Sequence, residues 1–304
     1  MIGAGGPGTT PAGDPRLDLA PPEGRGSRIL GGRRAVLISA ASTIAFFLVL
    51  AVAFSLAPGF RTFREDFLSF RAMKESFFGV PSQGEPAIWR AFLLNVKMFM
   101  IAEPLILALA LAIAVVRQIP GPVFFPVRLV ATAYTDFFRG IPLLLVIYIT
   151  GYGVPGLEIH GLSFYKSPTV YAVAALVLSY SAYVAEVYRA GIESVHPSQV
   201  AAARSLGLSH LQALRFVVIP QAVRRVIPPL LNDFISLQKD TALVAVLGNI
   251  EAARAAQIYG SFKFNYSSFL VAAALFIAIT IPLARFTDHL IERQRRRRSA
   301  GAMA

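Results

Sequence analysis

The side chains that could do chemistry in this sequence are charged groups set within or beside long apolar stretches. Seven of them are candidates for a substrate pathway or a gate: Glu103, Asp136, Arg139, Glu186, Arg189, Lys239 and Asp240. Placing one charge at the centre of a bilayer costs roughly 2.5–3.5 kcal/mol, so we expect these groups to face protein or a water-filled path. Such groups either line the path of a polar substrate or pin the helices around it.

Spacing separates the paired charges from the single ones. Asp136 and Arg139 are three residues apart, as are Glu186 and Arg189, and side chains at this spacing meet on one face of a helix. We interpret both pairs as structural pins of the gate helices. Glu103 is either a structural carboxylate, protonated or paired, or a part of the path. Lys239 and Asp240 are adjacent charged residues in the fifth apolar stretch, and the sequence does not decide their role.

The sequence contains no pattern that predicts an enzyme active site or a metal site. The chain has no cysteine, which excludes thiolate metal sites and cysteine nucleophiles, and its four histidines lack the spacing of metal ligands. Walker A, zinc-protease and kinase patterns do not occur. The sequence therefore predicts no catalytic residue, no metal and no cofactor in this chain. The energy for any pumping must come from a partner or an ion gradient.

Composition indicates a membrane protein rather than a soluble one. The chain is 55% hydrophobic and only 15% charged, whereas soluble domains are about 25% charged. Its net charge of +12 comes from arginines that flank apolar stretches, a pattern that the positive-inside rule explains better than nucleic-acid binding.

Six apolar stretches are long enough to cross the roughly 30 Å hydrocarbon core as helices. They span residues 35–57, 91–116, 123–150, 168–188, 226–247 and 267–290. Arginines precede the first stretch and follow the last, which places both termini in the cytoplasm. The expected fold is an all-α integral membrane protein with about six transmembrane helices. Gly140 and Pro142 predict a kink in the third.

The remaining segments differ in composition. Residues 1–34 are rich in glycine and proline and are interpreted as a disordered cytoplasmic tail. Residues 58–90 are expected to form an external loop, and 291–304 a basic cytoplasmic tail. The segment 189–225 is a long cytoplasmic loop between the fourth and fifth spans.

That cytoplasmic loop has a pattern of its own. A short helix is predicted to begin at His196 and to end at Gly207, which suits a left-handed helix-ending position. Ser209 and Gln212 then match a capping box for a second helix, expected to stop before Pro220. The expected apolar face of this second helix is Leu211, Leu214 and Val218. Such helices either pack on the ends of the spans or dock on a soluble partner.

The loop resembles a known motif. Ala201-Ala202-Ala203-x-x-x-Gly207, followed after nine residues by Val217-x-Ile219-Pro220, is similar to the EAA loop of binding-protein-dependent ABC importer permeases. Three further segments resemble motifs of the polar amino-acid branch of that family, which carries histidine, glutamine and glutamate: residues 138–144, 186–192 and 237–243. The resemblance covers 91–290, which would be the ABC type I permease transmembrane domain, and leaves 35–57 as an additional first helix.

The resemblance implies a function and a set of partners. The loop would be the coupling element that sits on a cytoplasmic ABC ATPase, through Ala201, Ala202, Ala203, Gly207, Leu211, Leu214, Ile219 and Pro220. An extracytoplasmic substrate-binding protein, a second permease copy or paralogue, and membrane lipid are the other expected partners. ATP and Mg would bind the ATPase, and this chain would hydrolyse nothing. It would form the translocation pathway for polar amino acids as a multi-pass protein of a bacterial cell membrane. Ala201 stands where the family has glutamate.

Two rival functions remain. A secondary amino-acid transporter driven by an ion gradient would use Glu103 and Asp240 as proton sites, but it would not need the helix–glycine–helix loop. A non-transporting membrane scaffold or sensor would not need charges in several spans. An ATPase encoded beside this chain would separate the ABC importer permease from both of these rivals.

Overall fold

The computed structural model describes residues 33–158 and 167–301, and the regular elements within these ranges are helices. The all-helical fold that the apolar stretches predict is therefore confirmed for the described part of the chain. The chain divides into two units, residues 1–61 and 62–304. The predicted tail, 1–34, lies outside the described residues except for its last two, which begin the first helix.

The first unit is built on α1 (Arg33–Ser55), which matches the predicted stretch 35–57. From Val36 onward its side chains are exposed, apart from the partly buried Ser39. A long apolar helix with exposed sides suits a lipid environment.

The second unit holds three long apolar helices: α4 (Ile88–Gln118), α8 (Pro168–Glu193) and α13 (Ser267–Gly301). With α1, four described helices are long and apolar enough to cross a membrane. A fifth span arises if α5 (Phe125–Gly140) and α6 (Leu143–Tyr148) together count as one. Six spans stay a prediction.

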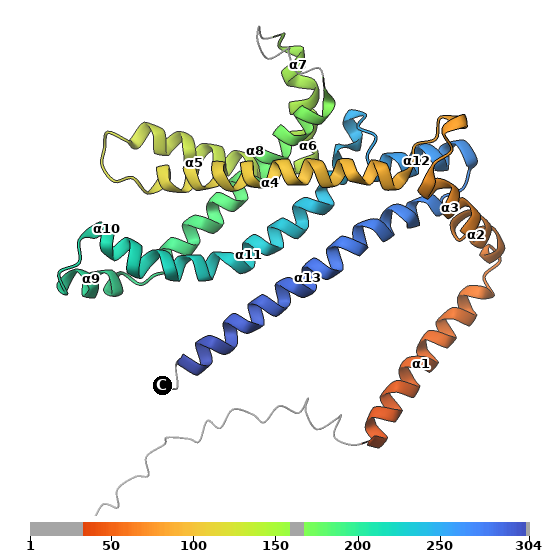
Figure 1. The fold of residues 1–304 in the computed structure, drawn as a ribbon, viewed down its shortest axis with the longest axis horizontal. Coiled ribbons are helices and arrows are strands. Elements are labelled where there is room, and N and C mark those ends of the chain that lie inside the picture. Colours follow the sequence, from red (N-terminus) through yellow and green to blue (C-terminus); the bar gives the residue numbers. More distant parts are fainter. Residues whose placement is uncertain (1–32, 159–166, 302–304) are drawn as a thin grey trace, which may run out of the picture. The chain divides into compact units, whose positions relative to one another are not determined.

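The third predicted span is broken where the sequence predicts a kink. α5 ends at Gly140, α6 begins after Pro142, and the two arms of the span meet at 109°. Figure 1 shows α6 leaving α5 steeply. Pro142 lacks an N–H and disfavours helical geometry at Ile141, whose φ is −105° and ψ is 134°. Two short elements continue the second arm, the π-helical turn η2 (Ile149–Gly153) and α7 (Val154–Gly156).

The core of the second unit lies along α4 and α8, which pack together through small side chains. Seven alanines of these two helices are completely buried: Ala102, Ala110, Ala114, Ala172, Ala175, Ala182 and Ala185. Small residues let helix backbones approach closely within a membrane. Met98, Ile106 and Leu176 fill the remaining space.

The segment 58–90, expected to be an external loop, contains short helices, and its external position stays a prediction. α2 (Phe60–Phe67) and α3 (Phe70–Phe78) are followed by a 3₁₀ turn, η1 (Pro81–Gln83). The N–H of Ser69, the residue that caps α3, donates to Ser267 Oγ at the start of α13 at 2.9 Å. Short helices with mixed charge contain no long apolar run, so the hydropathy pattern indicated a loop.

The fifth predicted span, 226–247, lies within a longer helical stretch. α11 (Ile219–Asp240) passes directly into a 3₁₀ segment, η4 (Thr241–Leu247). Two prolines and several charges interrupt the apolar character of α11, and it is not among the long apolar helices. α12 (Ala252–Lys263), which the apolar pattern missed, connects this stretch to α13.

The cytoplasmic loop of the prediction forms two short helices, α9 (Pro197–Ser205) and α10 (His210–Ala213). In Figure 1 they lie at one end of the second unit, whereas α3 and α12 lie at the other end, with α4 running between. The two ends are therefore separated by the length of a membrane-crossing helix.

Candidate functional site

The helix–glycine–helix pattern predicted for the loop is confirmed. His196 caps α9, and its Nδ1 accepts a hydrogen bond from Ser198 N at 3.2 Å. Gly207 follows with a left-handed φ of 87°. The predicted capping box begins α10: Ser209 N donates to Gln212 Oε1 at 2.8 Å, and Gln212 N donates to Ser209 Oγ at 3.3 Å.

The second loop helix does not stop before Pro220, so that prediction is wrong. α10 widens into a π-helical turn, η3 (Leu214–Val218), which continues directly into α11. Pro220 falls in the first turn of α11, directly after η3, so the helical stretch continues past a residue that has no N–H to donate.

The π-helical turn also changes which apolar side chains are buried. Ala213 and Val218, five residues apart, are buried, whereas Leu214 is half-buried and Leu211 is 74% exposed. The predicted face of Leu211, Leu214 and Val218 assumed α-helical spacing, and a π turn closes over five residues rather than four. Leu211 therefore points away from the bundle and does not share one face with Val218, so the predicted common face is wrong.

The other predicted coupling residues lie on both sides of the loop. Ala201 and Ala202 are exposed, whereas Ala203 is only 7% exposed and packs inward. Ile219 and Pro220 are exposed at the start of α11. Large apolar side chains at the loop surface form what we call the apolar patch: Leu206, Leu211 and Phe216, which are 82%, 74% and 63% exposed.

A cleft of about 610 Å³ lies on the inner side of the loop. Its walls come from the end of α4, the end of α8, α9, and the segment from α10 to η3. Its lining residues include Gln118 at the end of α4, and Ala201 and Arg204 on α9. The loop is therefore not packed solidly against the bundle, and it contacts α4 and α8 around an open space.

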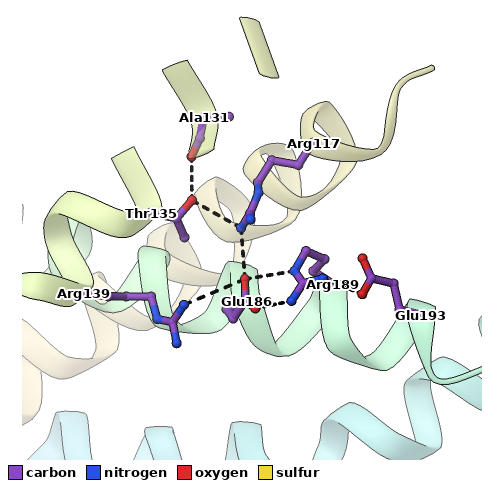
Figure 2. A network of polar contacts seen from close by, with 7 residues as sticks. All are labelled: Arg117, Ala131, Thr135, Arg139, Glu186, Arg189 and Glu193. Atoms are coloured by element: carbon purple, nitrogen blue, oxygen red, sulfur yellow. Dashed lines mark hydrogen bonds and ion pairs between the residues drawn. The ribbon is translucent and has the colours of Figure 1, made fainter. Parts of the chain in front are cut away.

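Charged side chains from three helices meet at Glu186, and Figure 2 shows this arrangement. Glu186 Oε2 accepts from Arg117 Nη1 at the end of α4 and from Arg189 Nε on α8, both at 3.0 Å. Arg189 forms a second bond to Glu186 and also pairs with Glu193. Arg139 Nη1 on α5 lies 4.0 Å from Glu186 Oε2. We call these five residues the Glu186 hub.

Of the two predicted ion pairs, one is present in the hub and the other is not formed. Glu186 and Arg189 are paired as predicted. Arg139 reaches Glu186 rather than Asp136, which is exposed, because Glu186 lies on the neighbouring helix. Arg117, which directly follows the second predicted span, also pairs with Glu186, and its side chain is 14% exposed. Its position at the end of that span gives no signal of a partner on another helix.

The remaining pathway candidates lie apart from the hub. Glu103 is half-buried on α4, in electrostatic range of Asp233 on α11 and Tyr188 on α8. Asp240 accepts a hydrogen bond from Tyr180 Oη at 2.7 Å, and Lys239 is exposed. Their roles in a pathway stay predictions. Over the described residues no group of histidine and carboxylate side chains could hold a metal ion.

Comparison with known proteins identifies the family. Residues 121–296 match the family described as binding-protein-dependent transport system inner membrane component. The chain is 36% identical to the probable glutamine ABC transporter permease GlnM of Bacillus subtilis over 61% of this chain and 82% of that protein. It is 33% identical to the arginine transport system permease ArtQ of Bacillus subtilis, over 62% and 90%.

Solved structures agree on the fold. One described as an amino acid ABC transporter with histidines is 31% identical, with a TM-score of 0.60, over 68% of this chain and 93% of that one. The MetNI methionine ABC transporter has a TM-score of 0.57 at 15% identity, over 71% and 99%, and supports the fold alone. The chain therefore belongs to the binding-protein-dependent transport system inner membrane components, the permeases of ABC importers, and is a multi-pass protein of the bacterial inner membrane.

Proposed function

We propose that this chain forms the translocation pathway of an ATP-driven importer of polar amino acids, and that the loop 196–220 couples it to a separate ATPase subunit. The observation that carries the coupling is the apolar patch of Leu206, Leu211 and Phe216, held outward on a capped helix–glycine–helix loop. Large apolar side chains that stay exposed on an ordered loop favour an interaction site there. The substrate class rests on relatives named for glutamine and arginine.

The partners follow from the family. A second permease copy or a paralogue would complete the pathway, two cytoplasmic ATPase subunits would bind ATP and Mg, and an extracytoplasmic binding protein would deliver the substrate. This chain would hydrolyse nothing. Closure of the ATPases on nucleotide would move the loop and rock the spans between inward-facing and outward-facing states.

Two hydrogen bonds give the loop a mechanical connection to the bundle. Gln221 Nε2 on α11 donates to Gln199 Oε1 on α9 at 2.7 Å. Arg225 Nη1 on α11 donates to Ser194 O, just after α8, at 2.6 Å. A force on α9 would therefore reach α11 and α8 directly.

The test of the proposed function changes the apolar patch. Leu206, Leu211 and Phe216 are replaced together by serine, and the matched control replaces Val123, which is 81% exposed in the turn after α4, by serine. The patch variant should insert normally but lose the copurifying ATPase and ATP-driven uptake, while the control keeps both. Uptake that persists in the patch variant and disappears with a protonophore would instead support the ion-gradient transporter.

The proposed topology has six spans and two cytoplasmic termini, with α11 and η4 supplying the fifth span. The chain contains no cysteine, so single cysteines can be placed at Ser27 and Ser299 without background. Both should resist a membrane-impermeant thiol reagent in intact cells, whereas a cysteine at the exposed Ser82 should react. Labelling at either terminus would overturn this topology.

A further inference from the structure

We propose that Arg117 is a positioning residue for energy coupling: it clasps α4 to α5 and α8, so that movement of the loop displaces the three helices as one body. This inference rests on the proposed coupling function. It concerns the Glu186 hub, whose residues belong to α4, α5 and α8 and not to the loop helices α9 and α10.

The geometry of Arg117 differs from that of an arginine anchored in lipid headgroups. Its side chain is 14% exposed, and one nitrogen, Nη1, makes both of its contacts. Nη1 donates to Glu186 Oε2 at 3.0 Å and to Thr135 Oγ1 at 3.3 Å. An arginine that served only membrane orientation would extend toward water or phosphate. Arg117 instead turns inward and contacts two other helices.

Thr135 is the residue of α5 that Arg117 contacts. It is completely buried, and its hydroxyl donates to Ala131 O at 2.5 Å while accepting from Arg117. The hydroxyl is therefore oriented with its lone pairs toward the guanidinium. Two further bonds hold α5 on α8, from Tyr134 Oη to Leu178 O at 2.7 Å and from Tyr183 Oη to Arg139 O at 3.3 Å. The two hydrogen bonds of Arg117 therefore attach α4 to a pair of helices, α5 and α8, that are already bonded to each other.

The hub borders the loop on two sides. Gln118, the residue after Arg117, lines the cleft together with Ala201 and Arg204 of α9. Glu186 lies on α8, which ends at Glu193, three residues before the cap of α9. A displacement of α9 would therefore reach the hub both through the cleft and along α8.

The charges of the hub are arranged around one carboxylate. Glu186 is faced by three guanidinium groups, those of Arg117, Arg139 and Arg189. Arg189 also forms an ion pair with a second carboxylate, that of Glu193. Removing Glu186 would leave three like charges together, whereas removing Arg117 leaves Glu186 still paired. Arg139 is 41% exposed and 4.0 Å away, so solvent screens its contribution.

The test compares coupling in four hub variants of the complete transporter, reconstituted with its ATPase and binding protein. Arg117→Gln should assemble and keep basal ATPase activity, while the substrate imported per ATP falls about fivefold or more, the lower range of coupling between sites. Arg117→Lys should restore most of it, because one ammonium can make both bonds of Nη1. Glu186→Gln should be worse than Arg117→Gln, and Arg139→Gln milder.

Arg128→Gln is the matched control for charge. Arg128 lies on α5 near the same end, and its Nη1 donates to Ile119 O at 2.6 Å without joining the hub. This variant removes the same positive charge and should keep normal coupling. Equal losses in Arg117→Gln and Arg128→Gln would overturn the proposal in favour of membrane orientation, and so would normal coupling in Arg117→Gln.

A second variant covers the case in which Arg117→Gln fails to assemble. Thr135→Val conserves volume and keeps the Arg117–Glu186 pair but removes the bond to α5, so an intermediate loss of coupling is expected. Normal coupling in Thr135→Val, together with failed assembly of Arg117→Gln, would reduce the hub to an assembly contact and overturn the inference. Failure of the proposed function is distinct, because the unaltered transporter itself would then show no ATP-driven uptake.

Discussion

Gly191 on α8 lies against Val226 on α11 with no space for a side chain between them. A Cβ atom added at Gly191 would lie 2.1 Å from Val226 Cγ1 and 3.5 Å from the carbonyl oxygen of Ala222. The crossing of the helices that lead into and out of the loop therefore depends on this glycine.

We expect Gly191→Ala to force α8 and α11 apart, with a loss of about 1–3 kcal/mol typical of overpacking. Valine at 226 is stiff about χ1 and has no free rotation to give way. The measurement is the unfolding temperature of the purified protein in detergent. Gly140→Ala, where an added Cβ meets nothing within 4 Å, should leave that temperature unchanged or raise it slightly.

The double variant Gly191→Ala with Val226→Ala tests the cause of that loss. Removing the Cγ atoms of Val226 makes space for the new methyl group, so the double variant should be more stable than the sum of the two single changes predicts. Strict additivity would show that the close approach does not determine the cost.

Asn95 joins α4 to the turn between η4 and α12. Its Nδ2 donates to Thr241 Oγ1 and to Glu251 Oε2, each at 3.1 Å, and its Oδ1 accepts from Ala252 N at 3.1 Å. All of these groups are buried. Asn95→Leu keeps the volume but leaves buried polar groups unsatisfied, at about 1–3 kcal/mol each. Its unfolding temperature should fall well below that of the exposed Asn232→Leu, and similar values for the two would contradict this role.

Glu251 predicts a pH dependence of stability. Its side chain is completely buried, and burial raises its pKa above the usual 4.5, although three N–H donors oppose this. The folded state then binds the proton more tightly than the unfolded chain. The contribution of this group is therefore fully present below about pH 4.5 and is lost as the pH rises through the raised pKa.

Glu251→Gln should flatten the dependence of the unfolding temperature on pH above pH 4.5. The absolute temperature should also fall, because an amide accepts fewer of the donors that meet the carboxylate. Glu75 is the comparison group: a hydrogen bond from Arg71 lowers its pKa, so its contribution is lost below pH 4.5 as the pH falls. A Glu251→Gln profile parallel to that of the unaltered protein between pH 5 and 8 would contradict the assignment.

Local patterns explain what the sequence predicted correctly. Gly207, the Ser209–Gln212 capping box and the break at Pro142 each follow from a rule that involves a few neighbouring residues. Such rules need no knowledge of the rest of the fold. The same reasoning failed at Pro220, because the π turn before it has no sequence signature that α-helical periodicity can detect.

Contacts between helices explain what the sequence did not predict. Spacing along one helix paired Arg139 with Asp136, but Arg139 meets Glu186 on another helix. Arg117 was given no partner for the same reason. The helices α3 and α12 were missed because they are short and only partly apolar, and contacts with α13 and α4 supply what their own pattern lacks.

The final prediction concerns the turn between the two loop helices. Gly207 has a φ of 87°, and a Cβ added there meets nothing within 4 Å. Space is therefore not the constraint, and the cost of a side chain is the left-handed backbone alone. Valine in this conformation is strained by about 1–3 kcal/mol, too little to unfold the bundle but enough to move α10 relative to α9. Asparagine tolerates the conformation better. Gly207→Val should insert normally yet lose ATPase stimulation and uptake, and Gly207→Asn should keep most of both.

Gly121 in the turn after α4 is the control, since its φ is 101° and it has the same free space. Gly121→Val carries the same strain outside the loop and should preserve coupling. Normal transport by Gly207→Val, or an equal loss in Gly121→Val, would show that the loop 196–220 is not the coupling element.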